Sequence, residues 1–176
     1  MRSFMILFFI LNSIISWGHP HVFVETYLTH SIDKSGDMNI RLTWEYDAMF
    51  SSGIIGDYDK DSDFELNEAE AKEIKNSIFL RMKEYNYYTE IYSEGKRIFP
   101  SPDFEASSKD GILKFRFYYT IPKEYLVKGN FIKIRVFDEE NYTAFKLAYY
   151  ARNDKNRKFL VEEGDWDEDI LKIPID

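Results

Sequence analysis

The sequence predicts a mainly β protein: an antiparallel β-sandwich, with an immunoglobulin-like arrangement as one option, that carries one α-helical, EF-hand-like insert. Short runs rich in Val, Ile, Thr and aromatic residues recur between turn signals along most of the chain. Between residues 47 and 86, by contrast, apolar residues follow a helical period. We therefore expect a single β-sandwich domain over residues 19–176, with the insert at about 47–86.

The candidate strands are runs in which apolar and polar residues alternate, or in which β-branched and aromatic residues gather. In chain order they are 21–33, 38–46, 87–92, 96–99, 103–107, 112–121, 131–138 and 142–149, with further short runs at 159–161 and 170–173. About seven of these runs are expected to form the sandwich. Turn residues at 34–37, 93–95 and 108–111 predict three hairpins.

The candidate core residues come from the apolar face of a strand and from the apolar stripe of a helix. One face of the run 38–46 is apolar and consists of Ile40, Leu42, Trp44 and Tyr46. Residues 67–85 have one apolar stripe at helical spacing, formed by Ala71, Ile74, Ile78, Met82 and Tyr85. The segment 47–57 is mixed and is expected to hold a short helix. A hydrophobic content of 44% is ample for a core in a chain of this length.

Residues 59–70 have the spacing of an EF-hand calcium loop, which takes oxygen ligands at positions 1, 3, 5, 7 and 9 and a bidentate carboxylate at position 12. Asp59, Asp61 and Asp63 occupy positions 1, 3 and 5. The remaining ligands would be the backbone carbonyl of Glu65, the side chain of Asn67 and the closing carboxylate of Glu70. Because Ca²⁺ takes about six to eight hard oxygen ligands, this stretch predicts a Ca²⁺ site.

Position 6 of the loop departs from the motif, because Phe64 stands where a glycine normally permits a positive φ. A bulky residue held in that conformation costs about 1–2 kcal/mol. In a second frame, the first three ligands, the turn residue and the closing carboxylate would be Asp57, Asp59, Asp61, Ser62 and Glu68. Leu66 at the usually apolar position 8 favours the first frame. Two other interpretations remain: helix capping by an acidic run, or a relic that no longer holds metal.

Residues 1–18 have the pattern of a secretory signal peptide. Arg2 precedes an apolar run over residues 4–15, which is too short to span a bilayer comfortably, and small residues stand at Ser16 and Gly18. We expect a periplasmic or secreted protein with no transmembrane span after cleavage; an uncleaved anchor is the alternative. The chain has no Cys, which excludes thiolate ligands and disulfides, and its net charge of −8 argues against nucleic-acid binding.

Cleavage after Gly18 would make His19 the new amino terminus, whose α-amine and imidazole can chelate one metal ion together. His21 lies two residues further on, so strand geometry places both imidazoles and the Glu25 carboxylate on one side. Imidazole suits Zn²⁺, Ni²⁺, Co²⁺ and Cu²⁺. Pro20 has no N–H, which excludes the copper and nickel motif that needs a deprotonated amide at the second residue. The alternative is a pair of surface histidines with no ligand.

Several segments follow the order and character of one known family. They are 19–25, 42–47, the acidic loop, 83–91, 136–138 and 142–145. Together they resemble the exported domain-of-unknown-function family numbered one thousand and seven. The resemblance implies a periplasmic component of an ABC-type transport system, often encoded near nickel or cobalt transporters, with no established enzymatic activity. Members of that family commonly have a glycine in the acidic loop, where this chain has Phe64.

We therefore expect a periplasmic divalent-metal-binding accessory protein of a metal transport system, with Ca²⁺ in the loop. By resemblance, its partner would be an inner-membrane metal transporter or an ABC permease. The alternative is a non-catalytic protein-interaction module with a vestigial metal loop, for which Tyr85, Tyr87 and Tyr88 would supply an exposed patch. Otherwise these tyrosines pack the exit of the helix against the sheet. We expect no enzyme, because the chain has no Cys nucleophile, serine-elbow motif or metalloprotease motif.

Overall fold

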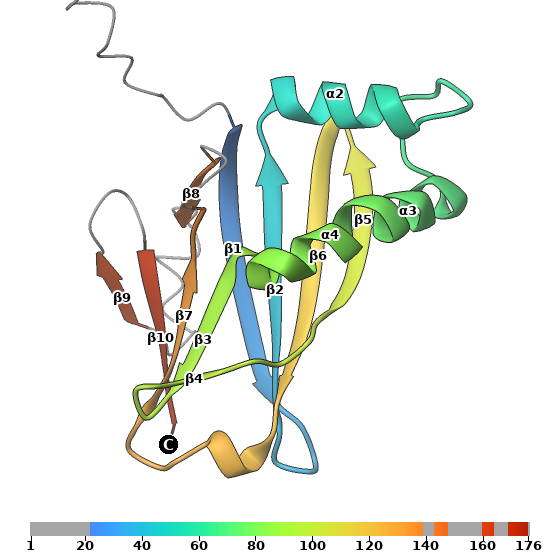
Figure 1. Cartoon of the computed structure of the whole chain (residues 1–176). Coiled ribbons are helices and arrows are strands. Elements are labelled where there is room, and N and C mark those ends of the chain that lie inside the picture. Colours follow the sequence, from blue (N-terminus) through green and yellow to red (C-terminus); the bar gives the residue numbers. More distant parts are fainter. Residues whose placement is uncertain (1–21, 139–142, 148–159, 164–168, 176) are drawn as a thin grey trace, which may run out of the picture.

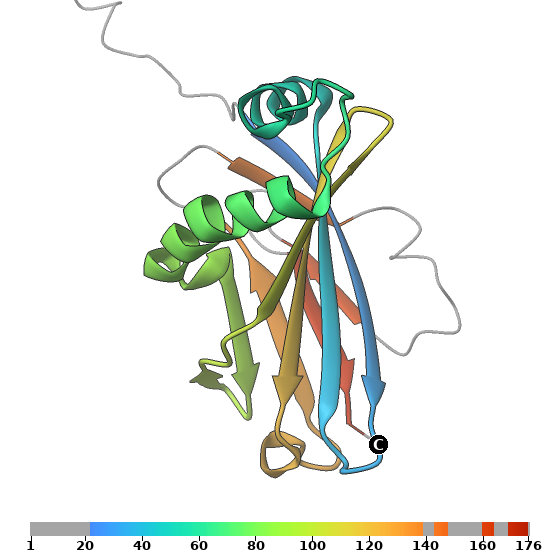
Figure 2. The same ribbon diagram turned by 90° about the vertical axis from the view of Figure 1, so that its right-hand side faces the viewer.

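Two five-stranded β-sheets pack face to face in the computed structural model, which describes residues 22–138, 143–147, 160–163 and 169–175 (Figures 1 and 2). Sheet A has the strand order β5-β6-β2-β1-β8, and sheet B has the order β4-β3-β7-β10-β9. The predicted mainly β sandwich is confirmed, with ten strands in the described residues where about seven were expected.

The bounds of the elements follow the predicted runs closely. Sheet A contains β1 (Val22–Ile32), β2 (Met38–Tyr46), β5 (Asp103–Lys109), β6 (Ile112–Ile121) and β8 (Thr143–Leu147). Sheet B contains β3 (Thr89–Ser93), β4 (Lys96–Ile98), β7 (Phe131–Val136), β9 (Leu160–Glu163) and β10 (Asp169–Pro174). The helical elements are α2 (Ala48–Tyr58), α3 (Glu68–Ile74), the π-helix η1 (Lys75–Phe79), α4 (Leu80–Met82), and the 3₁₀ turns η2 (Lys83–Tyr88) and η3 (Lys123–Tyr125).

The strand pairing is antiparallel throughout the described sheets, except between β1 and β8. That pair is parallel, with Val24 opposite Phe145. The predicted antiparallel sandwich therefore includes one parallel pair, at an edge of sheet A, that the sequence did not indicate. Parallel neighbours need a long connection between them, and β1 and β8 are separated by most of the chain. Turn residues therefore cannot predict the pairing of β1 with β8.

Two tight turns form where the turn residues predict them. Glu94–Gly95 joins β3 to β4 and Asp110–Gly111 joins β5 to β6; their φ values are 50°, 75°, 53° and 76°. Two successive residues with positive φ form a type I′ turn, whose twist matches that of the flanking strands.

Asp33 closes the turn between β1 and β2. Its Oδ1 accepts hydrogen bonds from the hydroxyl (2.6 Å) and the backbone N–H (2.9 Å) of Ser35. The bond from the Ser35 hydroxyl lowers the pKa of Asp33 to about 2; desolvation opposes this shift, and Asn39 and the N–H groups of Asp37 and Ser35 assist it. The ionised form of this carboxyl is thus part of the turn.

We expect Asp33→Asn to remove a pH-dependent contribution to the free energy of unfolding. Because the folded-state pKa lies below the ordinary value of 3.8, the contribution is present above about pH 4 and disappears as the pH falls towards about 2. Urea unfolding of both proteins across this range measures it. The wild-type advantage should shrink in acid, and a difference that stays constant down to about pH 2 would contradict this role.

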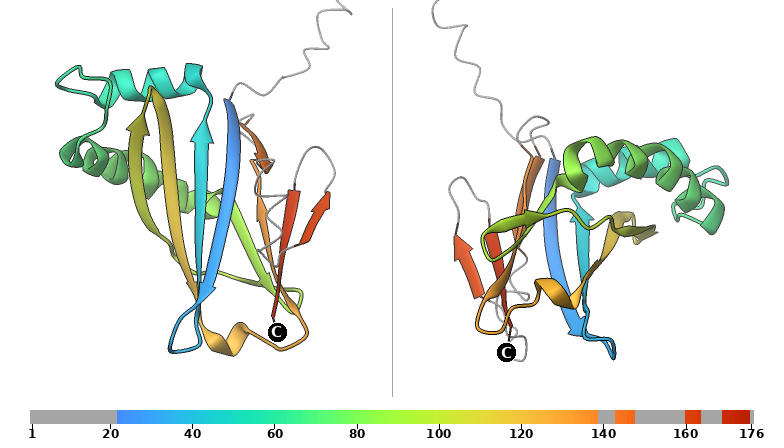
Figure 3. Two further views of the ribbon diagram at one scale, coloured as in Figure 1. Left: turned by 180° about the vertical axis from the view of Figure 1, so that it is seen from behind. Right: turned by 60° about the horizontal axis from the view of Figure 1, so that its bottom comes forward.

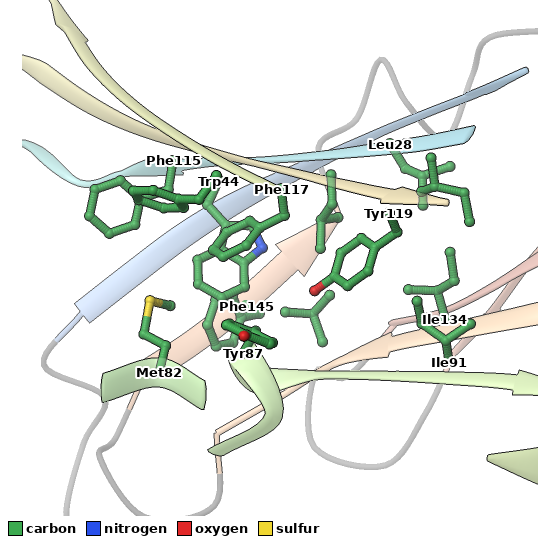
Figure 4. Packing of buried hydrophobic residues seen from close by; sticks show 14 of the residues in the cluster. Leu28, Trp44, Met82, Tyr87, Ile91, Phe115, Phe117, Tyr119, Ile134 and Phe145 are labelled. Atoms are coloured by element: carbon green, nitrogen blue, oxygen red, sulfur yellow. The ribbon is translucent and has the colours of Figure 1, made fainter. Parts of the chain in front are cut away.

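The core lies between the two sheets and is centred on Trp44, which is fully buried. The centroid of its ring lies 4.4 Å from that of Phe117 on β6 and 4.7 Å from that of Phe145 on β8. Figure 4 shows Met82 and Tyr87 approaching the same cluster from the helical insert. The alternation in β2 thus places the predicted apolar face in the core, as expected for a strand with one buried side.

The helical insert forms between β2 and β3, but its second half is not one regular helix. After α3, the five-residue π-helix η1 changes the phase of the side chains. Phe79 is therefore buried where the regular spacing predicted Ile78, which is half-buried. At the end of the stripe, Tyr85 is 45% exposed, so its assignment to the core was wrong. A π-helix cannot be recognised from the spacing of apolar residues alone.

The insert packs on one end and on the core-facing side of sheet A. Figures 1 and 3 show α2 lying across the end of the sheet and the α3–α4 segment crossing its core-facing side, where Phe79 contacts Phe104 on β5. The Ser51 hydroxyl accepts a hydrogen bond from the Leu113 N–H (3.0 Å), which fixes α2 to β6. The hydroxyls of Tyr58 and Ser77 lie 2.8 Å apart and join the two helical segments. In the part of the chain that the structure describes, no helix is long and apolar enough to cross a membrane.

Candidate metal centre

The acidic loop connects two helices. Helix α2 begins after the N-cap Asp47 and ends at Tyr58, and Asp59 is its C-cap. Helix α3 begins after the N-cap Asn67, whose Oδ1 accepts hydrogen bonds from the N–H groups of Ala69 (3.0 Å) and Glu70 (3.2 Å). The order helix, acidic loop, helix is the order of an EF-hand.

Three aspartates of the loop converge. Each of Asp59, Asp61 and Asp63 offers one carboxylate oxygen, and these three oxygens all lie within 4.8 Å of one another. The three side chains are half-buried or exposed, so an ion can reach them. They are the residues that the sequence places at positions 1, 3 and 5 of the loop.

Backbone N–H groups hold the loop in a tight curl around Asp59. Its Oδ2 accepts a hydrogen bond from the Phe64 N–H (2.8 Å), and its Oδ1 accepts one from the Asp63 N–H (3.3 Å). The Asp63 Oδ1 in turn accepts from the Glu65 N–H (2.8 Å). These bonds run from the start of the loop to its middle, so the curl is built by the same side chains that form the acidic cluster.

Phe64 adopts the conformation that a glycine would adopt at position 6. Its φ is +65°, in the left-handed region that bulky side chains avoid. Its side chain is 73% exposed, so packing does not compensate for the strain. The loop therefore keeps the sharp turn of the motif although the residue that normally makes it easy is replaced.

We expect Phe64→Gly to raise the free energy of unfolding by up to about 1 kcal/mol, because glycine relieves the left-handed strain and loses little packing. Phe64→Ala is the matched control, since alanine also removes the ring but keeps a Cβ at positive φ. Urea denaturation of the three proteins measures the effect. Equal stabilisation by both substitutions would mean that exposure of the ring, and not backbone strain, is the cost.

Glu70 closes the loop from inside. The residue is 2% exposed, and its carboxylate accepts hydrogen bonds from the Lys60 N–H (2.7 Å) and the Asn67 N–H (2.9 Å). Together with the bonds to Asn67 Oδ1, this completes a capping box. Helix capping is thus a real part of this loop. Glu70 stands beside the three converging oxygens and does not belong to that group.

The other two predicted positions have different roles. Asn67 uses its Oδ1 in the cap and donates from Nδ2 to Asp61 Oδ2 at 3.3 Å, so it orders the rim of the cluster. The side chain of Glu65 is exposed, in keeping with a residue whose backbone carbonyl was the expected donor. In the second frame, Asp57 would be a ligand, but it lies within helix α2, and Glu68 is exposed at the start of α3. Neither belongs to the converging group, which favours the first frame.

The aspartates titrate in opposite directions. Desolvation opposes ionisation of Asp59, but the backbone N–H groups of Phe64, Ser62 and Asp63 lower its pKa. Desolvation, followed by the carboxylates of Asp63 and Glu70, raises the pKa of Asp61. A cation at the cluster would relieve the repulsion at Asp61. The converging donors are oxygens only, which suits Ca²⁺ or Mg²⁺ better than Zn²⁺.

The predicted amino-terminal metal site is described only in part. His19 and His21 lie outside the described residues. Glu25 is exposed on β1 and accepts a hydrogen bond from the Tyr27 hydroxyl at 2.7 Å. Directly across from it on β2 stands Glu45, which accepts from the same hydroxyl at 3.3 Å and from Lys114 at 2.6 Å.

Glu45 was missed by sequence reasoning, although the position of the turn after β1 fixes the pairing of Glu25 with it. Both glutamates line a cavity of about 500 Å³ near the N-terminal end of β1, together with Asp47 and the rings of Phe23 and Phe145. The structure thus brings a second carboxylate to the predicted Glu25.

The tyrosine cluster does not form the exposed patch that a docking surface would need. Tyr87 is 7% exposed and its ring stacks on Phe79 at 5.0 Å, while Tyr88 is half-buried and lies 6.5 Å from Trp44. Only Tyr85 is exposed. The cluster therefore packs the exit of the helical insert against the sheets.

Comparison with known proteins identifies a family. The family model described as "Protein of unknown function (DUF1007)" matches residues 4–163. No curated protein and no solved structure matches the chain.

Proposed function

The chain belongs to the DUF1007 family of proteins of unknown function, and we propose that it is a periplasmic divalent-cation-binding accessory protein of a metal transport system. The observation that carries the proposal is the convergence of Asp59, Asp61 and Asp63, in a loop with the spacing of a calcium motif. Three carboxylates within 4.8 Å repel one another unless a proton or a cation compensates. The loop is thus chemically prepared for a hard divalent cation.

In this proposal the cation acts as a structural clamp. Asp59, Asp61 and Asp63 would hold Ca²⁺ with the Glu65 carbonyl, and Glu70 and Asn67 would order the loop from its base. The loop joins α2 to α3 and is fixed to sheet A by the Leu66 N–H, which donates to the Ser108 hydroxyl at 2.7 Å. A single loop with this anchoring supports a role in ordering the insert rather than a switch with two moving helices.

The transported metal would be handled elsewhere, at the amino terminus. We propose His19, His21 and Glu25 as its ligands for Zn²⁺, Ni²⁺, Co²⁺ or Cu²⁺. Glu45, directly opposite Glu25, is a further carboxylate in reach of the same strand end. The inner-membrane metal transporter or ABC permease that would receive the metal is proposed on the family resemblance alone, and so is the periplasmic location.

A second candidate function is a non-catalytic interaction module with a vestigial loop. The exposed ring of Phe64 at the tip of the loop favours it, because an aromatic residue held at a cost in backbone strain is more easily explained by a contact with a partner. This candidate predicts no effect of cations on the protein.

Calorimetric titration separates the two candidates. The first predicts that Ca²⁺ binds one site and that Asp61→Asn weakens it, whereas Zn²⁺ or Ni²⁺ binds a second site that His21→Ala weakens. Each variant serves as the control for the other. If neither variant weakens binding of its ion, or if none of the ions gives heat with the wild type, the proposed metal-binding function is wrong.

A further inference from the structure

The outward face of sheet A has a hollow of about 780 Å³. Its lining comes from the last residues of β1 and β6 and the first residues of β2 and β5. Figures 1 and 3 show that these strand ends lie at the end of the sheet opposite to α2 and the acidic loop. We call this cavity the sheet A hollow. It contains none of the residues proposed above as metal ligands.

One row of side chains crosses the sheet A hollow from β1 to β5. In the strand register, Arg41 on β2 lies between Thr29 on β1 and Tyr118 on β6. Tyr118 in turn lies opposite Asp103 on β5. Because side chains alternate along a strand and the neighbours of these residues are buried, the row faces away from the core; the buried neighbours are Leu28, Ile40, Leu42, Phe104, Phe117 and Tyr119. Adjacent strands are about 4.8 Å apart, so the row places a cation and a carboxylate about 10 Å apart, with a tyrosine between them.

The groups on both sides of Tyr118 are available to a ligand. Among the described residues, neither the Arg41 guanidinium nor the Asp103 carboxylate has a hydrogen-bond or ion-pair partner. The Tyr118 hydroxyl donates to Glu105 Oε2 at 2.8 Å, which holds the side chain in place, and the residue is 38% exposed. The row therefore offers a donor-only group, an acceptor-only group and the surface of an aromatic ring.

A second row, nearer the turn between β1 and β2, is ordered by its own hydrogen bonds. Asn39 on β2 lies between Ser31 on β1 and Thr120 on β6. The Thr120 hydroxyl donates to Asn39 Oδ1 at 3.0 Å, and Asn39 Nδ2 donates to Asp33 Oδ2 at 3.2 Å. This part of the hollow thus consists of hydroxyl and amide groups that are held in position before a ligand arrives, which lowers the entropic cost of binding.

The sheet A hollow continues into a second cavity of about 370 Å³ beside the connection from β4 to β5. The two cavities share Asp103, Tyr118 and Thr120. The second cavity is also lined by Phe99 and Tyr125, whose side chains are 70% and 40% exposed. A ligand that lies on Tyr118 can therefore extend over further aromatic surface, so the combined site fits an elongated ligand.

We propose that the sheet A hollow binds a neutral oligosaccharide. A sugar hydroxyl both donates and accepts hydrogen bonds, so neighbouring hydroxyls satisfy Arg41 and Asp103 alike. The C–H face of the sugar ring is apolar and packs on the ring of Tyr118. The next charges along the face, Arg116 and Glu105, already pair with each other at 3.0 Å. An anionic ligand would meet Asp103 and a cationic one would meet Arg41, which selects against both.

The position of the hollow also favours a sugar over an extended peptide. A peptide that adds to a sheet needs an edge strand with unpaired backbone groups. The hollow lies instead over β2 and β6, and each of these strands has a neighbour on both sides. The ligand must therefore be recognised by side chains. Hydroxyl, amide and charged side chains around an exposed ring suit a polyhydroxylated ligand.

Saturation-transfer difference NMR on the full chain tests the proposal, with a chelator present so that no cation contributes. The probes are maltohexaose, cellohexaose and chitohexaose, and an acetylated and amidated hexaglycine peptide is the comparison. At least one hexasaccharide should receive saturation at its ring C–H protons. The corresponding monosaccharide should bind more weakly, because it cannot reach both cavities.

Two substitutions at Tyr118 test the role of its ring. Tyr118→Ala should weaken binding of the sugar roughly tenfold, because it removes the surface on which the sugar packs. Tyr118→Phe is the matched control, since it keeps the ring and removes only the hydroxyl that bonds Glu105. This variant should bind like the wild type. The side chain lies on the solvent side of the sheet, so neither substitution opens a cavity in the core.

A charge-neutral double variant tests the polar groups. Arg41→Ala/Asp103→Ala removes one cation and one carboxylate, so the net charge is unchanged, and it should weaken sugar binding at least tenfold because hydrogen bonds to charged groups are lost. The matched control Lys83→Ala/Glu84→Ala removes the same pair of charges from exposed positions on the insert. It should bind like the wild type.

Four results would overturn the proposal. The first is no saturation transfer to any of the three hexasaccharides at millimolar concentration. The second is equal binding by Tyr118→Ala and Tyr118→Phe, and the third is equal binding by the two double variants. The fourth is saturation transfer to the hexaglycine peptide and to none of the sugars, which would assign the hollow to a polypeptide. None of these results bears on cation binding by the acidic loop.

Discussion

Calcium is expected to raise the free energy of unfolding of this protein by about 2.7 kcal/mol when present at a hundred times its dissociation constant. For a chain of this size that corresponds to a rise in melting temperature of roughly 5–10 °C. The physical reason is that the converging oxygens of Asp59, Asp61 and Asp63 are brought together only in the folded chain. A cation bound only by the folded state shifts the equilibrium towards it. Differential scanning calorimetry with calcium and then with excess chelator measures the shift.

The variant Asp61→Asn/Asp63→Asn should abolish this shift. Its matched control is Asp57→Asn/Glu68→Gln, which removes two charges from the same stretch at exposed positions outside the cluster. The control also tests the second frame, in which Asp57 and Glu68 would be ligands. A loss of the calcium shift in the control but not in the first variant would transfer the site to that frame.

In the absence of calcium, the single variant Asp61→Asn should raise the free energy of unfolding. Since desolvation and the carboxylates of Asp63 and Glu70 raise the pKa of Asp61, its charge is unfavourable in the folded loop near neutral pH. Removal of that charge should slightly stabilise the calcium-free protein while it weakens calcium binding. A variant that destabilises the calcium-free protein would show that Asp61 is needed for the loop and not for the ion.

Trp44→Ala is expected to lower the free energy of unfolding by about 3–5 kcal/mol, a large part of the total for a domain. The indole ring is fully buried between the sheets and contacts rings from β6 and β8. Its removal leaves a cavity that both sheets line, so collapse around it would disturb the packing of both. Urea denaturation of the wild type and the variant measures the loss.

Two further variants sharpen this prediction. Phe99→Ala removes an aromatic ring that is 70% exposed, so it should cost less than about 1 kcal/mol. Trp44→Phe should lower the free energy of unfolding by less than Trp44→Ala. It keeps an aromatic ring in the core and removes an indole N–H that has no hydrogen-bond partner among the described residues. Equal losses in the Phe99 and Trp44 variants would show that the core is not centred where the structure places it.

The acidic loop shows how much of the candidate site could be predicted from local sequence. The spacing of the aspartates, the sharp turn at Phe64 and the start of a helix at Asn67 all depend on residues within the loop, and each could be predicted before the fold was known. The actual role of Glu70 could not. A glutamate at that position can hold either an ion or the N–H groups at the start of a helix, and its burial depends on how α3 packs against β5.

The sequence by itself determined the elements of this protein: the strand runs, the three Gly-containing hairpin turns, the acidic loop and the helical insert. These depend on interactions between residues close in the chain, such as side-chain alternation, turn geometry and capping. Only the tertiary structure decided the parallel pairing of β1 with β8, the meeting of Glu25 with Glu45 and the row of side chains from Thr29 to Asp103. The backbone groups that join strands are the same in every residue, so strand order is selected by the packing of whole sheet faces, which no short segment encodes.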